Sequence, residues 1–135
     1  MKLDTKLYNM NFEIKREELN DERLQILLKY DCMMKITIDD SVIYDDWVCP
    51  LEMLKVIRSW EHKIKENDFV DFIYNSEDND NNPIISFRYN ALTSKWHFRS
   101  CFDKKKLIKG FTLIDIHLLF VDFKNQIYEH VKRTI

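Results

Sequence analysis

The sequence contains a single glycine, Gly110, in 135 residues. Backbone that wraps closely around a phosphate or a dinucleotide usually needs glycine, because glycine adopts positive φ angles and close approach without steric cost. A chain with one glycine cannot contain a G-x-G-x-x-G dinucleotide motif, a Walker A loop or a G-x-S-x-G nucleophile elbow. The usual sequence support for several large classes of nucleotide-dependent and hydrolytic enzymes is therefore missing.

Cysteine and long apolar runs are also scarce. Cys32, Cys49 and Cys101 are an odd number of cysteines at wide spacings, whereas a secreted disulfide framework normally has an even count. We expect free, buried or half-buried thiols in a reducing cytoplasm. No apolar run approaches the roughly 18–20 residues that a membrane-spanning helix requires, and the first residues do not open an apolar signal segment. These features predict a cytoplasmic protein without a membrane partner.

The residues that are present suit one folded domain. The length is typical of a single domain, and apolar residues at 45%, with aromatics at 13%, supply a core. The charged residues, 33% of the chain, are mixed in sign and leave a net charge of −2. Bulk charge therefore attracts the chain neither to nucleic acid nor to an anionic membrane. We expect one α+β domain over residues 1–135.

Alternating polar and apolar residues predict strands at several places in the chain. The clearest are 8–15, 32–38, 69–74, 84–89 and 95–101. A shorter run at 42–44 follows the turn residues Asp39 and Asp40 and predicts a hairpin. The charged segment 16–31 leaves three alternatives open, namely a short helix, a loop or a further strand.

Two segments show helical spacing. Pro50 suits the first position of a helix over 50–65, and Thr112 with Asp115 forms a T-x-x-D capping box for a long helix near 112–132. Apolar stripes mark both helices: Met53, Leu54, Ile57, Trp60 and Ile64 in the first, and Leu113, Ile116, Phe120, Ile127 and Val131 in the second. His117 is expected to be a core histidine of the second helix. Strands grouped apart from helices predict an α+β fold, with an antiparallel sheet of about five to six strands and two main helices on one face.

The sequence contains no complete motif for metal binding or catalysis. The loop 78–82 begins like a calcium-binding loop, but Pro83 stands where glycine is required and Tyr89 where a bidentate glutamate is required. His62, His97, His117 and His130 lack zinc-like spacing. We expect no metal, no cofactor and no catalytic residue. A small enzyme built on Cys101 or Cys49 with a histidine is the third-ranked hypothesis, because many chains permit such a combination.

Charge distribution is the feature that points to a partner. Residues 39–80 hold twelve acidic and four basic side chains, a balance of −8, whereas residues 88–109 hold seven basic residues and one acidic residue, a balance of +6. An acidic face would suit a basic protein partner and steer its association. The basic stretch 95–109 would suit nucleic acid, although it lacks the known recognition motifs. Folding could also intermix the two blocks into an ordinary surface.

The tryptophans refine this hypothesis. Trp60 lies at helical spacing and is expected in the core, whereas Trp47 and Trp96 could each be half-exposed contact anchors, because tryptophan is enriched in binding hot spots. The candidate partner-binding residues are Asp45, Asp46, Trp47, Glu77, Asp78 and Asp80. The alternative basic patch consists of Arg99, Lys104, Lys105, Lys106 and Lys109.

Four short strings carry a resemblance to known sequences. They are Pro50-Leu51-x-x-Leu54-x-x-Ile57-x-x-Trp60, Phe72-x-Tyr74-x-Ser76, Pro83-Ile84-Ile85-Ser86-Phe87 and Trp96-x-Phe98-x-Ser100. Over residues 32–130 the chain resembles small uncharacterised bacterial proteins of low-GC Gram-positive genomes, of the immunity-protein type that neutralises polymorphic toxins. The resemblance implies a non-catalytic inhibitor that occludes a toxin domain, and it brings no catalytic residues. The alternative is a small nucleic-acid-associated regulator.

Overall fold

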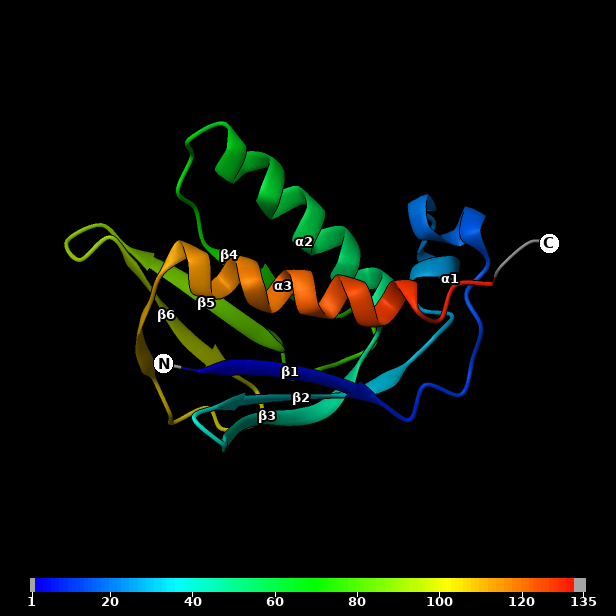
Figure 1. Cartoon of the computed structure of the whole chain (residues 1–135), viewed down its shortest axis with the longest axis horizontal. Helices are drawn as coiled ribbons and strands as arrows, with labels where there is room; N and C mark the ends of the chain where they lie inside the picture. Colours follow the sequence, from blue (N-terminus) through cyan, green and yellow to red (C-terminus); the bar gives the residue numbers. More distant parts are fainter. Residues whose placement is uncertain (1, 133–135) are drawn as a thin grey trace.

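The first of two antiparallel sheets is built around a tight hairpin. The computed structural model describes residues 2–132 of the chain (Figure 1). The first sheet has the order β1-β2-β3, with β1 (Leu3–Tyr8), β2 (Cys32–Ile38) and β3 (Ser41–Val48). Asp39 and Asp40 join β2 to β3 with φ angles of 47° and 69°. Two successive positive φ angles match the twist of the strands, so the expected hairpin is confirmed.

The second sheet is the expected meander with one strand added. Its order is β4-β5-β6-β7, with β4 (Phe72–Tyr74), β5 (Ile85–Asn90), β6 (Lys95–Ser100) and β7 (Ile108–Phe111). The sequence pattern did not predict β7, which is short and contains the single glycine. Gly110 has a φ of 92°, and a Cβ there would meet nothing within 4 Å. The backbone angle, and not a lack of space, therefore calls for glycine.

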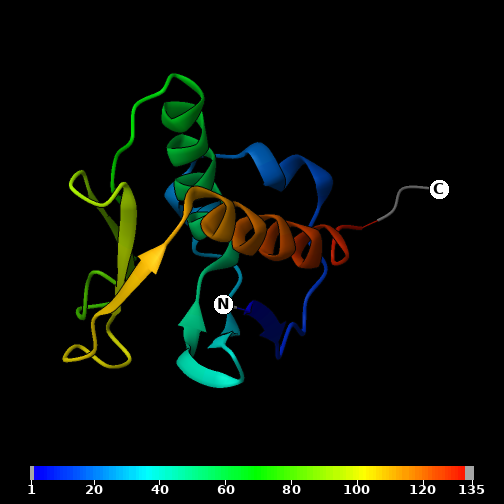
Figure 2. The ribbon, with the colours of Figure 1, turned by 60° about the vertical axis from the view of Figure 1, so that its left-hand side comes forward.

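The α+β class is confirmed, but the expected single sheet is divided into two. The described residues form seven strands, and α2 (Pro50–Lys65) separates the first sheet from the second along the chain. Helix α3 (Leu113–Tyr128) contacts β1, and α2 contacts β4. Figure 2 shows the first sheet below the two helices and the second sheet beside them. One buried cluster joins the inner faces of both sheets to both helices. The division into two sheets was not predicted, because alternation along a strand does not reveal which strands pair.

The prediction of a strand over 8–15 was wrong. Asn9 takes a φ of 55°, which ends β1 at Tyr8, and the following residues run extended without joining a sheet. Ile14 is fully buried and exchanges hydrogen bonds of 2.7 Å with the backbone of His130 and Lys132. The alternating apolar residues Met10, Phe12 and Ile14 pack against the core, and Ile14 makes one isolated bridge to Val131 without joining either sheet.

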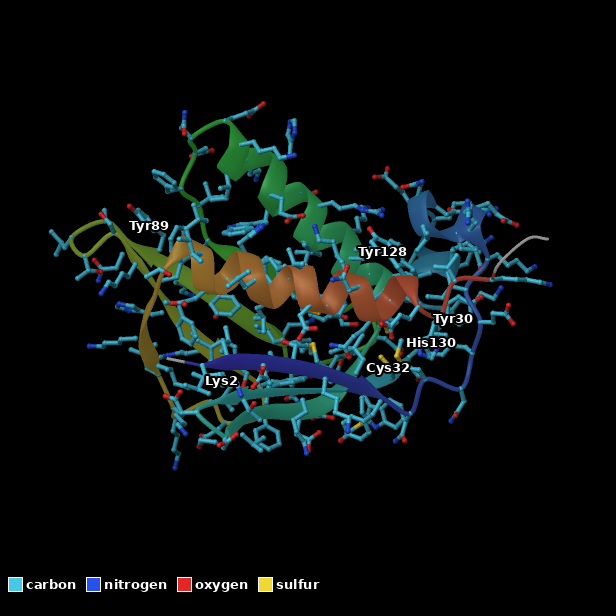
Figure 3. All side chains as sticks on the ribbon, in the orientation of Figure 1. Lys2, Tyr30, Cys32, Tyr89, Tyr128 and His130 are labelled. Carbon is cyan, nitrogen blue, oxygen red and sulfur yellow. The ribbon has the colours of Figure 1, made fainter. Side chains whose placement is uncertain are left out.

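Segment 16–31, for which the sequence left a helix, a loop and a strand as alternatives, contains two short helices. These are η1 (Arg16–Asn20), a 3-10 helix, and α1 (Leu24–Leu27). The Glu18 carboxyl is buried and accepts hydrogen bonds from Lys29 Nζ at 2.8 Å and from the Tyr30 hydroxyl at 2.6 Å. Burial would raise the pKa of Glu18, but these hydrogen bonds outweigh it and lower the pKa. Tyr30 and His130 lie near the end of α3, as Figure 3 shows.

Both main helices begin where the sequence predicted. The amide of Asp115 donates to Thr112 Oγ1 at 3.2 Å, and the amide of Thr112 donates to Asp115 Oδ2 at 2.9 Å, so the capping box is confirmed. Helix α3 ends at Tyr128, earlier than expected. The prediction that His117 is a core residue was wrong. Its neighbour Ile116 is fully buried, and a step of 100° around the helix turns the His117 side chain to solvent.

Trp60 lies at the centre of the aromatic core, as expected. Its side chain is 5% exposed, its indole N–H donates to the Val70 carbonyl at 3.0 Å, and its ring meets Phe72 and Phe120 edge to face. Trp96 is also buried. Of the two tryptophans whose exposure the sequence left open, only Trp47 reaches the surface, with 51% of its area exposed.

We expect Trp60→Ala to lower the free energy of unfolding by about 3–5 kcal/mol, because it removes a large buried ring and leaves a cavity. Urea denaturation followed by circular dichroism measures this loss. Trp47→Ala is the matched control and should change the stability by less than about 1 kcal/mol. Equal losses in the two variants would contradict the placement of Trp60 in the core.

Candidate functional site

Trp47 stands in a row of large side chains on the outer face of the first sheet. Trp47 pairs with Met33 of β2, and Met33 pairs with Tyr8 of β1. The neighbouring positions of β2, Cys32 and Met34, are buried. Because successive side chains alternate between the faces of a sheet, Tyr8, Met33 and Trp47 lie together on the outer face. An exposed indole extending such a row is a typical anchor for a binding partner.

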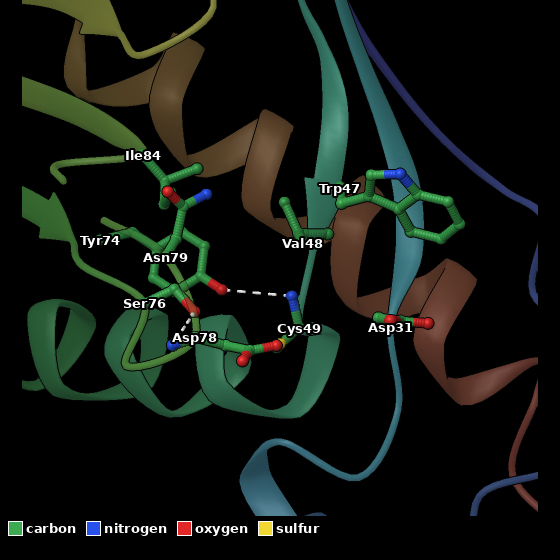
Figure 4. A pocket seen from close by; sticks show the side chains of 9 residues that line it. All are labelled: Asp31, Trp47, Val48, Cys49, Tyr74, Ser76, Asp78, Asn79 and Ile84. Carbon is green, nitrogen blue, oxygen red and sulfur yellow. Dashed lines mark hydrogen bonds between the residues drawn. The ribbon is translucent and has the colours of Figure 1, made fainter. Parts of the chain in front are cut away.

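A shallow depression opens beside Trp47, where β3 ends and α2 begins. Its volume is about 60 Å³, and Asp31 and Asp78 line it with Trp47, Cys49 and Tyr74 (Figure 4). Small-molecule sites usually have volumes of about 300–1,000 Å³. The depression is therefore too small for a substrate pocket. It suits a single side chain of a larger partner.

The buried carboxyl of Glu52 fixes the wall of this depression. Glu52 lies in the first turn of α2 and is 6% exposed. The Tyr74 hydroxyl donates to Glu52 Oε1 at 2.8 Å, and the Glu77 amide donates to Glu52 Oε2 at 3.1 Å. The amide of Cys49 in turn donates to the Tyr74 hydroxyl at 3.2 Å. One carboxyl thus connects the end of β3, the start of α2, β4 and the loop after β4.

The loop 75–83 carries the acidic residues Glu77, Asp78 and Asp80 and is held by its own side chains. Asn82 Oδ1 accepts from the Ser76 amide at 2.9 Å, and Asn82 Nδ2 donates to the carbonyls of Ser76 and Asn79, each at 2.9 Å. These bonds use the Asn82 amide for turn formation. The resemblance of the loop sequence to a calcium-binding loop is thus explained by the hydrogen bonds that its side chains make within the loop.

The fold separates two aspartates that are adjacent in sequence. Asp45 is opposite Lys35, on the same outer face as Trp47, and accepts a hydrogen bond from the Tyr8 hydroxyl. Asp46 is opposite the buried Met34, on the other face, and accepts from the Trp47 amide at 2.7 Å. Asp45 therefore flanks Trp47 directly, whereas Asp46 orients the backbone that carries it.

We define the Trp47 surface by side chains of the first sheet and of two adjoining segments. Its members are Tyr8, Asp31, Met33, Asp45, Trp47 and Asp78. Three of the candidate residues from the sequence, Asp45, Trp47 and Asp78, thus come together. Glu77 and Asp80 are exposed in the same loop but do not line the depression.

Sequence reasoning missed three members of the Trp47 surface. Asp31 directly precedes Cys32, which pairs with Val48. Extending the predicted hairpin by one residue would therefore have placed Asp31 beside Cys49. Met33 could have been found in the same way, opposite Trp47. Tyr8 could not, because β1 was assigned to the wrong residues.

Ion pairs link the acidic and basic blocks of the sequence at one place in the described residues. Within residues 2–132, the ion pair between Arg88 and Asp71, at 3.5 Å, is the one that joins them. The basic candidates do not form one patch. Arg99 and Lys104 line a depression on the second sheet, whereas Lys105, Lys106 and Lys109 are exposed outside it.

The cysteines do not offer a ready nucleophile. Burial raises the pKa of Cys32 to about 12 and that of Cys49 to about 11, and burial also raises the pKa of the half-buried Cys101. A protonated thiol is a weak nucleophile. His62 lies twelve residues beyond the first residue of α2, or about 18 Å along the axis, so it does not reach Cys49.

Two further findings concern metals and membranes. In the part of the chain that the structure describes, no three histidine, cysteine or acidic side chains gather as metal ligands would. No helix within residues 2–132 combines the length and the apolar character needed to cross a bilayer.

The fold and the Trp47 surface define a small α+β protein in which two antiparallel sheets pack against a pair of helices. A family model described as Domain of unknown function (DUF7878) matches residues 8–133, and the chain belongs to this family. Neither the curated proteins nor the solved structures contain a match to the chain.

We expect Glu52→Gln to lower the free energy of unfolding by about 1–3 kcal/mol, because an amide group replaces one of two accepting oxygens in a buried network. Hydrogen exchange at the Glu77 amide should accelerate in the same variant. Glu66→Gln, at the exposed end of α2, is the control and should change neither quantity. Unchanged exchange at Glu77 in a destabilised Glu52→Gln protein would contradict the proposed role of Glu52 in holding the loop.

Proposed function

We propose that the protein is a non-catalytic binding module whose Trp47 surface docks against a basic face of a protein partner. The observation that carries this proposal is the indole of Trp47, 51% exposed on a row of apolar side chains and bordered by Asp31, Asp45 and Asp78. Tryptophan at the centre with polar groups at the rim is the usual anatomy of a binding hot spot.

The size of the depression favours a macromolecular partner over a substrate. A volume of about 60 Å³ is well below the roughly 300–1,000 Å³ of small-molecule sites, so the depression suits the end of one side chain. A lysine or arginine of the partner could enter it and meet Asp31 and Asp78, while the flat row formed by Tyr8, Met33 and Trp47 packs against apolar surface.

The resemblance to immunity-type proteins suggests the class of partner. An immunity protein binds its toxin stoichiometrically and blocks the toxin's own active surface, so it needs no catalytic group of its own. We therefore propose a cytoplasmic inhibitor of a toxin domain with a basic active surface. The alternative, a nucleic-acid-associated regulator using residues 95–109, receives less support, because the exposed lysines of that stretch are spread over a loop and β7.

We expect Trp47→Ala to weaken binding to the cognate partner by about 2 kcal/mol or more, the loss that defines a hot spot. The partner to test is a toxin domain, sought first among the products of neighbouring genes, and biolayer interferometry measures the affinity. Leu92→Ala removes an apolar side chain that is 96% exposed at a hairpin tip and serves as the matched control.

The acidic rim should act mainly on the association rate. Asp31→Lys and Asp78→Lys together should slow association by about tenfold at low salt, because rim charges steer encounter. Asp68→Lys reverses an exposed charge beyond the C-terminal end of α2 and should leave the association rate unchanged. A complex that forms equally well with Trp47→Ala and with the double reversal would exclude the Trp47 surface as the interface.

A further inference from the structure

The outer face of the second sheet carries a separate depression of about 260 Å³. Its lining includes Asn82, Ser86, Arg88, Arg99 and Lys104, and within the described residues no carboxylate lines it. It shares no residue with the Trp47 surface. The loop 75–83 lies between the two, with Asn79 on the first depression and Asn82 on the second.

The pairing of β5 with β6 places three of these side chains on one face. Ser86 pairs with Arg99, and the next pair along the strands, Phe87 with Phe98, is buried in the core. Because side chains alternate, Ser86, Arg88 and Arg99 face outward. Lys104 reaches the same depression from the loop that follows β6.

The positive charge in this depression is only partly balanced. Arg88 lies 3.5 Å from Asp71, whereas Arg99 and Lys104 make no ion pair with any residue in the range 2–132. Ser86 also lines the depression, although the residue as a whole is 2% exposed. A serine hydroxyl on a depression that Arg99 and Lys104 also line, with no carboxylate in the described lining, is a combination that an anion would complete.

We propose that this depression binds the phosphate group of a small phosphorylated molecule. The Arg99 guanidinium can hold two phosphate oxygens at once, Lys104 supplies a second positive charge, and the Ser86 hydroxyl donates to a third oxygen. The volume lies just below the range of about 300–1,000 Å³ for complete small-molecule sites. The depression therefore takes the phosphate end, and the rest of the molecule extends into solvent.

A single phosphate monoester fits this depression better than a nucleic-acid backbone. A polymer would need a track of cations along its length, but Lys105, Lys106 and Lys109 do not line the depression. Binding of a phosphate monoester would occur without the protein partner and independently of the Trp47 surface.

Isothermal titration calorimetry with inorganic phosphate and with glucose 6-phosphate tests the proposal on the full chain, with glucose as the uncharged control. We expect saturable binding of both phosphates and none of glucose. Arg99→Gln and Lys104→Gln should each raise the Kd about tenfold, and Ser86→Ala should raise it about threefold. Lys95→Gln, an exposed lysine at the other end of β6, should change the Kd by less than about twofold.

Nuclear magnetic resonance locates the site, because phosphate should shift the Ser86 amide and the Arg99 Nε–H signals. The proposal is overturned if neither phosphate binds, or if Lys95→Gln weakens binding as much as Arg99→Gln. It is also overturned if a single-stranded oligonucleotide binds more tightly than glucose 6-phosphate with a steep salt dependence, since that result indicates many backbone phosphates.

Discussion

The buried carboxyl of Glu52 is the constraint on which the arrangement of both surfaces depends. It receives hydrogen bonds from the Tyr74 hydroxyl and the Glu77 amide, and Tyr74 receives one from Cys49. These contacts join the first sheet, α2 and the second sheet at one point. Burial raises the pKa of Tyr74 far above its usual value, so its hydroxyl keeps the proton that it donates.

On either side of this junction lie two surfaces of opposite charge. The first sheet presents Trp47 with Asp31, Asp45 and Asp78, and the second presents Arg99 with Lys104. The loop 75–83 borders both surfaces and is fixed by Asn82 and by Glu52. The loop therefore separates two surfaces that share no lining residue.

Local patterns in the sequence predicted most of the elements but not their assembly. Pro50 and the Thr112–Asp115 box marked the starts of both long helices, and alternation marked β2, β5 and β6, because these signals depend on neighbouring residues. Which strands pair depends on contacts between residues far apart in the sequence, so the division into two sheets was missed. At the site, Trp47 and Asp78 could be proposed from residue type and charge, whereas Tyr8 required the correct assignment of β1.

The most direct test of the account is whether Trp47 enters the interface with a protein partner. The chain has three tryptophans, of which Trp60 and Trp96 are buried. Fluorine NMR of the chain labelled with 5-fluorotryptophan therefore gives one solvent-sensitive signal and two protected ones. We expect saturation with the cognate protein partner to shift the Trp47 signal and to remove its sensitivity to solvent isotope. A saturated complex in which the Trp47 signal keeps its position and solvent sensitivity would contradict the account.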